Sequence, residues 1–420
     1  MKWVERWYVS YALLGLSAAG LIPILLPLLV SRSGGAAQIG VVMAAFSLGG
    51  LTAPVWGRLA DRFRLHRVLL MSGSACIAAG AISFPLTSSL ALGTGLALLS
   101  GIGLAASSTV ANLFIVEARP RREWDDRIGW LQTFFGGGQV LGLVLAGLLG
   151  QSAPDKGMLL AGAVAGIAII PAALETRQDA GFLESRRPVL FRSVHRTEWP
   201  VGSPQHLYHH PDLLRLATVL RGVESPFGLF LAAWLVSFAG STAIFSLYPV
   251  LMQQLYGVEP ARSAAVYAVA AGLGLVLYAP SGKWSEKKGP QSVLRYGLAL
   301  RIAAFTVLTV LTLLPVPSRG PFAMTFFPVI VLAWSLLSVS STALVAVLTP
   351  QNEGQGMGVF NAVTALSGVI GAAAGGWAAS LWGYKAVPVL GGAGAAAGMA
   401  IMLKLFPAGP VRKKSEEAEP

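Results

Sequence analysis

Twelve apolar segments, most of them close to twenty residues long, dominate this chain and restrict what it can fold into. They cover residues 7–30, 39–56, 68–88, 90–115, 128–150, 157–174, 227–253, 261–281, 293–315, 321–347, 356–381 and 386–406. About twenty consecutive apolar residues, when helical, cross a bilayer with every backbone polar group paired. Only 12% of the residues are charged, about half the usual share in soluble proteins. We therefore predict an all-α membrane protein with twelve transmembrane helices and the lipid bilayer as its surroundings.

A polar stretch divides the twelve segments into two sets of six, which predicts four parts. These are a six-helix bundle over 1–174, a cytoplasmic central loop over 175–226, a second six-helix bundle over 227–406 and a disordered cytoplasmic tail over 407–420. The first apolar stretch is too long for the apolar region of a signal peptide and lacks a clear cleavage site. We expect it to stay as the first membrane helix.

The distribution of basic residues predicts the orientation of the chain. With twelve spans, 26 of the 31 Lys and Arg residues fall on the side that carries the N-terminus. Basic residues collect in cytoplasmic loops, so we place both termini in the cytoplasm and the protein in the cell (inner) membrane. The net charge of +12 has the same explanation, and no nucleic-acid partner is expected. The single cysteine, Cys76, excludes an intramolecular disulfide.

Two matches indicate that the halves of the chain are related by an internal repeat. GRLADRF in the first half corresponds to GKWSEKK in the second, where Gly57 matches Gly282 and Asp61 matches Glu286. A second group of matched residues lies further along the chain, and the same number of positions separates the members of each pair. It pairs Gly129 with Gly358, Gln132 with Asn361, Gly142 with Gly371, and Gly147 with Gly376. Because six spans separate the copies, the repeat is parallel, which is one of the known transporter architectures.

The stretch GRLADRFRLHR, residues 57–67, resembles the motif that joins helices 2 and 3 in the major facilitator superfamily. With twelve spans and the 6+6 repeat, the chain is most similar to drug-efflux type members, which implies transport by alternating access. It departs from that pattern in two places. Ala97 stands where the helix 4 motif often has arginine, and the glycine-rich run 136–142 lacks the proline of antiporter members. Both departures weaken the inference that this chain exchanges protons for drugs as antiporter members of the family do.

The charged connection is predicted to act as a conformational gate. Asp61 can accept hydrogen bonds from the amides at a helix N-terminus, and the family resemblance suggests the helix that starts near Gly354. Glu117 is a candidate ion-pair partner for Arg58 or Arg67. The alternative for the arginines is a topology signal alone. The predicted gate residues are Gly57, Arg58, Asp61, Arg62, Arg67, Glu117, Gly282 and Glu286.

The spans hold no Asp or Glu well inside them, so the predicted substrate cavity is polar but mostly neutral. Its candidate residues are Asn112, Gln132, Gln139, Trp234, Arg301, Trp334 and Asn361, with hydroxyls from Ser335, Ser338 and Ser341. Packing between helices is the alternative role for each of them. Arg301 could bind an anionic group or a carbonyl, but we expect it to snorkel to the cytoplasmic interface. Such a cavity favours a neutral or lipophilic substrate.

The central loop carries two further features. His206, His209 and His210 are close in sequence, but no cysteine and few acids accompany them, so no metal site is predicted. The stretch PDLLRLATVLRG, residues 211–222, has an apolar face with basic flanks and is expected to lie on the membrane surface as an amphipathic helix.

These observations predict a secondary transporter and no enzyme. The sequence has no GxSxG, Walker A or HExxH motif, so no catalytic residues or cofactor are expected, although proton or ion coupling stays open. We expect export of small neutral or lipophilic compounds by a monomer. Uptake or facilitated diffusion of a neutral metabolite such as a sugar is the alternative. A non-transporting sensor is disfavoured because the central loop is too short for a large output domain.

Overall fold

The computed structural model describes residues 4–63, 65–118, 123–175, 225–313, 319–349 and 353–406. Within these residues the chain forms helices and short connections, and twelve helices are long and apolar enough to cross a membrane. The predicted all-α fold with twelve membrane helices is therefore confirmed. The three histidines of the central loop, its predicted amphipathic helix and the tail 407–420 lie outside the described residues.

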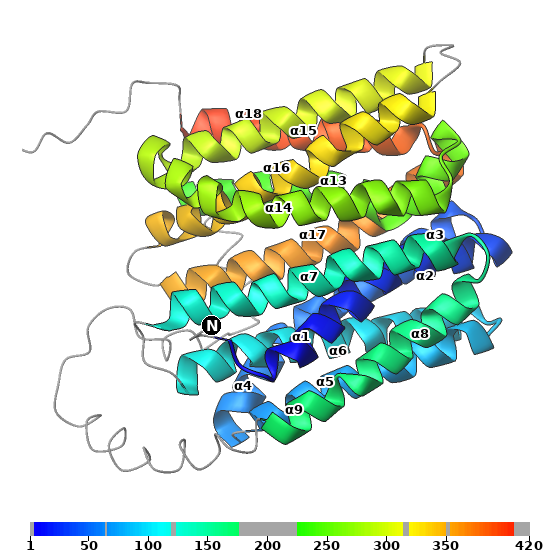
Figure 1. Ribbon diagram of the computed structural model, residues 1–420. Coiled ribbons are helices and arrows are strands. Elements are labelled where there is room, and N and C mark those ends of the chain that lie inside the picture. Colours follow the sequence, from blue (N-terminus) through cyan, green and yellow to red (C-terminus); the bar gives the residue numbers. More distant parts are fainter. Residues whose placement is uncertain are drawn as a thin grey trace, which may run out of the picture.

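The first six spans contain several shorter helical elements (Figure 1). In chain order these elements are α1 (Tyr8–Leu14), η1 (Gly15–Leu21), α2 (Ile22–Ser33), α3 (Ala36–Leu48), η2 (Gly49–Thr52), α4 (Ala53–Phe63), α5 (His66–Ser83), η3 (Phe84–Leu86), α6 (Leu90–Ala118), α7 (Trp124–Gly150), α8 (Pro154–Ile167) and α9 (Ile169–Glu175). α1, η1 and α2 form the first span, and α3, η2 and α4 form the second.

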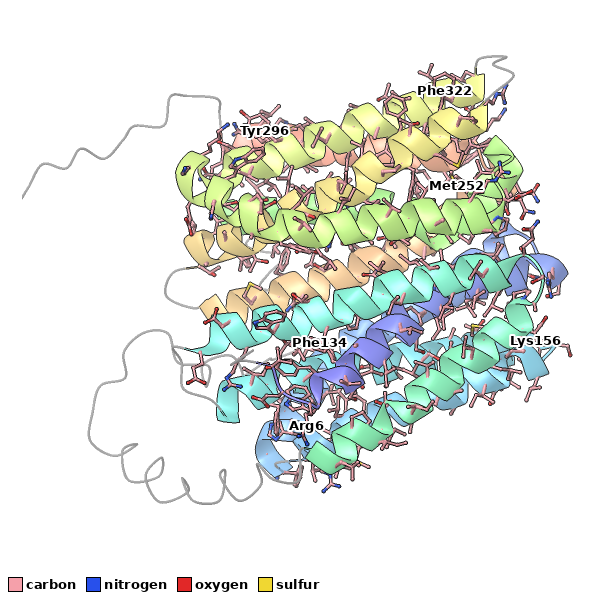
Figure 2. All side chains as sticks on the ribbon, viewed as in Figure 1. Arg6, Phe134, Lys156, Met252, Tyr296 and Phe322 are labelled. Carbon is pink, nitrogen blue, oxygen red and sulfur yellow. The ribbon has the colours of Figure 1, made fainter. Side chains whose placement is uncertain are left out.

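The last six spans are each a single helix. They are α13 (Pro226–Tyr256), α14 (Pro260–Lys288), α15 (Pro290–Leu313), α16 (Arg319–Leu348), α17 (Glu353–Trp382) and α18 (Ala386–Leu405). We call the side on which α1 begins and α18 ends the terminal face, and the other side the opposite face. Figure 2 shows Arg6 and Lys156 at these two ends of the molecule.

The charged motif at residues 57–67 is helical over most of its length, which corrects the prediction of a loop. Gly57 to Phe63 form the last turns of α4, and α5 begins at His66. Leu, Ala and Arg favour helix, so the segment continues past the apolar stretch into the interface. The same reason extends α14 to Lys288, beyond the predicted end of its span. Hydropathy locates the membrane core and not the ends of the helices.

Close packing of α7 on the first span explains two glycines of the run 136–142. A Cβ atom on Gly138 would clash with the carbonyl oxygen of Ala12, and one on Gly142 with that of Leu16. The contact lies where the first span changes to the π-helical element η1. Small residues allow helix backbones to approach closely in a membrane, so these glycines are needed for packing within the N-terminal half.

An ion-pair network joins the start of the chain to α7 at the terminal face. The Arg127 guanidinium donates to Glu5, and its Nε donates to Glu123 over 2.9 Å. The Trp7 indole N–H donates to the same Glu5 carboxylate over 2.7 Å. Because these side chains are largely buried, the network is less exposed to screening by salt than a surface ion pair.

The two halves contact each other closely toward the opposite face. A Cβ atom on Gly376 of α17 would lie 2.6 Å from the Cα of Gly40 on α3. A Cβ atom on Gly147 of α7 would lie 3.0 Å from the Cβ of Ala264 on α14. α2 also contacts α13. Three pairs of helices from different halves therefore close the opposite face.

The halves separate toward the terminal face. A Cβ atom on Gly129 of α7, Gly282 of α14 or Gly358 of α17 would have no neighbour within 4 Å. α4, which ends the second span, packs on α6 of its own half. In Figure 1, α7 and α14 converge away from the end of the molecule marked N. The structure is thus closed at the opposite face and splayed at the terminal face.

Candidate functional site

A cavity of about 590 Å³ lies between the two halves, near the middle of the spans. Its lining comes from the second, fourth and fifth spans of the N-terminal half and from α13 to α17 of the C-terminal half. Ligand cavities in proteins have volumes of about 300–1,000 Å³. A solute bound here would contact both halves, so movement of the halves would change the face from which it is reached.

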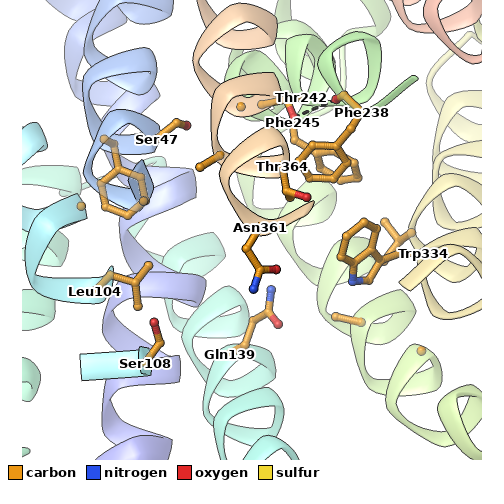
Figure 3. A pocket seen from close by; sticks show the side chains of 18 of the residues that line it. Ser47, Leu104, Ser108, Gln139, Phe238, Thr242, Phe245, Trp334, Asn361 and Thr364 are labelled. Atoms are coloured by element: carbon orange, nitrogen blue, oxygen red, sulfur yellow. Dashed lines mark hydrogen bonds between the residues drawn. The ribbon is translucent and has the colours of Figure 1, made fainter. Parts of the chain in front are cut away.

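Two amides meet in this cavity from different halves. Gln139 comes from α7 and Asn361 from α17, and their side chains point toward each other (Figure 3). Each amide carries both donors and an acceptor, so the pair can bind a polar group of either kind. Both residues were among the predicted cavity residues, and the structure places both in the lining.

Arg301 also lines the cavity, and the expectation that it snorkels to the interface is wrong. Its side chain is only 2% exposed, and its guanidinium donates to the Ser241 hydroxyl over 2.6 Å. The guanidinium carbon lies 5.7 Å from the centre of the Trp334 ring, a distance at which a cation is attracted to an aromatic face. The side chain therefore extends inward from α15 between α13 and α16.

An aromatic wall faces Arg301 on the C-terminal side of the cavity. Trp334 lies against Phe238 with ring centres 5.4 Å apart, and Phe238 stacks on Trp234 at 5.6 Å. The Trp234 indole N–H donates to the Thr364 hydroxyl over 2.8 Å, which ties α13 to α17. Trp334, Phe238 and Thr364 line the cavity, whereas Trp234 lies behind them. The wall offers flat apolar surface on a rigid support.

Asn112 and Gln132, both predicted to line the cavity, lie outside its lining. The Gln132 amide donates to the Asn112 side chain over 3.4 Å, and the Asn112 amide donates to the carbonyl of Ser108. Both also interact with the Tyr11 hydroxyl. The predicted repeat pairs Gln132 with Asn361, but of these two residues only Asn361 lines the cavity. Ser335 lines it, and Ser338 and Ser341 do not.

Two tyrosines of α14 line the cavity, and neither was predicted from the sequence. Tyr267 packs edge-on against Phe327 and interacts electrostatically with Arg301. Tyr278 lies beside Trp334 and Ser338, and its hydroxyl interacts with both side chains. The signal that could have found them is their spacing of eleven residues, which is about three helical turns and puts both on one face of a helix.

The predicted gate residues lie at the terminal face. The Arg58 side chain is exposed and bends back to the carbonyl of Pro54 over 3.4 Å. The Arg62 guanidinium lies 5.3 Å from the Phe63 ring centre. Glu286 is exposed and Gly282 has open space beside it. Arg67 is in the first turn of α5, with its Nε buried. The side chains of Asp61 and Glu117 lie outside the described residues, so their predicted contacts stay predictions.

No group of three or more His, Cys, Asp or Glu side chains within the described residues is arranged to hold a metal ion. Among the described residues that line the cavity, Arg301 alone has a charged side chain.

The family model described as Major Facilitator Superfamily matches residues 7–352. The chain belongs to the major facilitator superfamily. Its twelve helices and the cavity between its halves agree with that assignment, and the resemblance seen in the charged motif is confirmed. The protein is an integral membrane transporter of small molecules and not an enzyme, and transporters of this family need no cofactor.

Two solved structures share the fold of this chain but have little sequence in common with it. A crystal structure of a mutant of the nucleoside transporter NupG superposes with a TM-score of 0.75 and 11% identity, covering 96% of this chain and 98% of that one. A crystal structure of a D-xylose-proton symporter gives a TM-score of 0.68 and 12% identity, covering 96% of each chain. Identities this low establish the shared fold and no more.

Proposed function

We propose that this transporter carries a small organic solute across the cell membrane by alternating access, with the central cavity as the binding site. The observation that supports this most is the asymmetry of the two faces. The halves meet closely at Gly40 and Gly376, while Gly358 of the same α17 has open space beside it. Rocking the halves about the cavity would open one face as the other closes.

We further propose that the terminal face is cytoplasmic, which makes this the inward-facing state. Lys and Arg predominate on that side of the chain, as cytoplasmic loops require. The predicted gate at residues 57–67 would then bring the halves together in the outward-facing state and separate in the present one. The exposed Arg58 and Glu286 side chains fit a gate that is open.

Export of lipophilic compounds and uptake of a polar metabolite are the two candidate directions. The aromatic wall of the cavity favours a substrate with an apolar body. Gln139, Asn361 and Arg301 favour a polar group on the same molecule. The two structural neighbours are named as a transporter of nucleosides and a symporter of D-xylose, which are polar solutes. Uptake of a polar metabolite is therefore at least as well supported as export of a lipophilic compound.

Flux through the purified protein in liposomes tests this proposal. Candidate solutes that raise the melting temperature of the protein in detergent would be loaded inside or outside the vesicles, with and without a pH gradient. We expect saturable flux of at least one such solute, and the gradient will show whether protons are coupled. Flux no faster than in empty liposomes for every stabilising solute would refute the proposal.

A further inference from the structure

The cavity contains a buried positive charge that nothing in its described surroundings neutralises. Arg301 is 2% exposed, yet it makes no salt bridge with any described residue, and the described lining holds no carboxylate. Transferring an unpaired charge out of water is costly, so ionisable groups within membrane spans are rare and usually functional. The charge on Arg301 therefore calls for an explanation beyond packing.

Most of the hydrogen-bonding capacity of this guanidinium is unused. Arginine has five N–H donors, and Arg301 uses one of them on the Ser241 hydroxyl. Its Nε is buried and has no partner. The guanidinium carbon lies over the Trp334 ring, and Arg301 forms part of the cavity lining. An arginine in a cavity wall with most of its donors unused is suited to a carboxylate, which accepts two parallel hydrogen bonds.

A structural role alone would not require the charge. A neutral amide could donate to Ser241 and pack against Trp334, as Gln139 and Asn361 show that amides are accommodated in the same cavity. What an amide cannot do is attract an anion into a space surrounded by Phe238, Phe245 and Trp334.

We propose that Arg301 binds the carboxylate of a small organic monoanion whose flat or apolar body lies on the aromatic wall. This inference rests on the proposed function, since it names the substrate class of the same cavity. It replaces the neutral or lipophilic substrate expected from the sequence. A single cation balances a single negative charge, whereas phosphate esters are bound by several basic groups. Gln139 and Asn361, from the two halves, then serve the neutral polar groups of the substrate.

The proposal is tested by comparing acids with their neutral amides of nearly equal size. Calorimetric titration of the purified full-length protein would use benzoate, 3-phenylpropionate and indole-3-acetate, each beside its amide. We expect at least one acid to bind about 10- to 150-fold more tightly than its amide, the range for a hydrogen bond to a charged group. Arg301→Gln should reduce acid binding to the level of the amide. Arg301→Lys should keep part of the preference, because it keeps the charge but not the planar donor edge.

Arg295→Gln is the matched control, because it removes the same charge from α15 at a residue outside the cavity lining. It should retain the acid preference. Amide binding retained in Arg301→Gln would show that the cavity is still formed. Equal binding of acid and amide by the wild type, an acid preference that survives in Arg301→Gln, or no binding of any acid would overturn the inference. If neutral solutes still showed saturable flux in liposomes, the proposed function would stand while the inference failed.

Discussion

The glycine contact at the opposite face predicts that one added methyl group changes the conformational equilibrium. In Gly376→Ala, the new Cβ would lie 2.6 Å from the Cα of Gly40 and 2.7 Å from the carbonyl oxygen of Ala36. Both neighbours are backbone atoms, so the clash can be relieved only by moving α3 away from α17. Overpacking of this kind costs about 1–3 kcal/mol. Because the cost falls only on the state closed at this face, the population ratio should shift about 5- to 150-fold toward the other state.

Spin labels on the two halves can measure this shift. Ser33 and Lys385 are exposed at the opposite face, one in each half, and can be replaced by labelled cysteines in a Cys76→Ala background. We expect the distance distribution between the labels to gain a longer component in Gly376→Ala. Gly358→Ala is the control, since it changes the same helix in the same way but has no neighbour within 4 Å. Identical distributions in all three proteins, or an equal shift in both variants, would refute the reasoning.

Two further predictions concern packing and the gate. Gly138→Ala should lower the melting temperature by an amount equivalent to about 1–3 kcal/mol. The new Cβ would clash with the Ala12 carbonyl in any state that keeps the first span packed on α7. The adjacent Gly137→Ala has open space and should leave the melting temperature equal or higher, as alanine favours helix; equal losses in both variants would contradict this account. Asp61→Asn should abolish solute flux in liposomes while leaving the yield of folded protein unchanged, and wild-type flux in that variant would remove Asp61 from the gate.

Hydropathy and the internal repeat predicted the fold because a bilayer allows few solutions for a chain like this one. Twelve long apolar segments require twelve helices, and matched glycines in the two halves indicate related bundles. The ends of the helices were less predictable. Gly57 to Phe63 and the charged end of α14 continue as helix through the interface, where hydropathy falls but helix propensity does not.

The cavity was only partly predictable, because a linear sequence gives the depth of a residue more readily than the direction it faces. Arg301 was a candidate cavity residue but was expected to snorkel to the interface, whereas its side chain is buried at the cavity. Its partner Ser241 is sixty residues earlier in the chain. Asn112 and Gln132 are amides in apolar surroundings, as Gln139 is, yet they interact with each other and with Tyr11. Only the packing of the helices separates these cases.

Alternate exposure of the cavity is the central claim, and labelling one cysteine from both sides of the membrane tests it most directly. Ala271, in the middle of α14, lines the cavity and can be replaced by cysteine in the Cys76→Ala background. A membrane-impermeant maleimide would be added to vesicles of each orientation. We predict modification from both faces, with a higher rate from the terminal face. Gly376→Ala should raise the rate of modification from the opposite face and lower the rate from the terminal face. Modification from one face only, with the same rate in both backgrounds, would contradict the account.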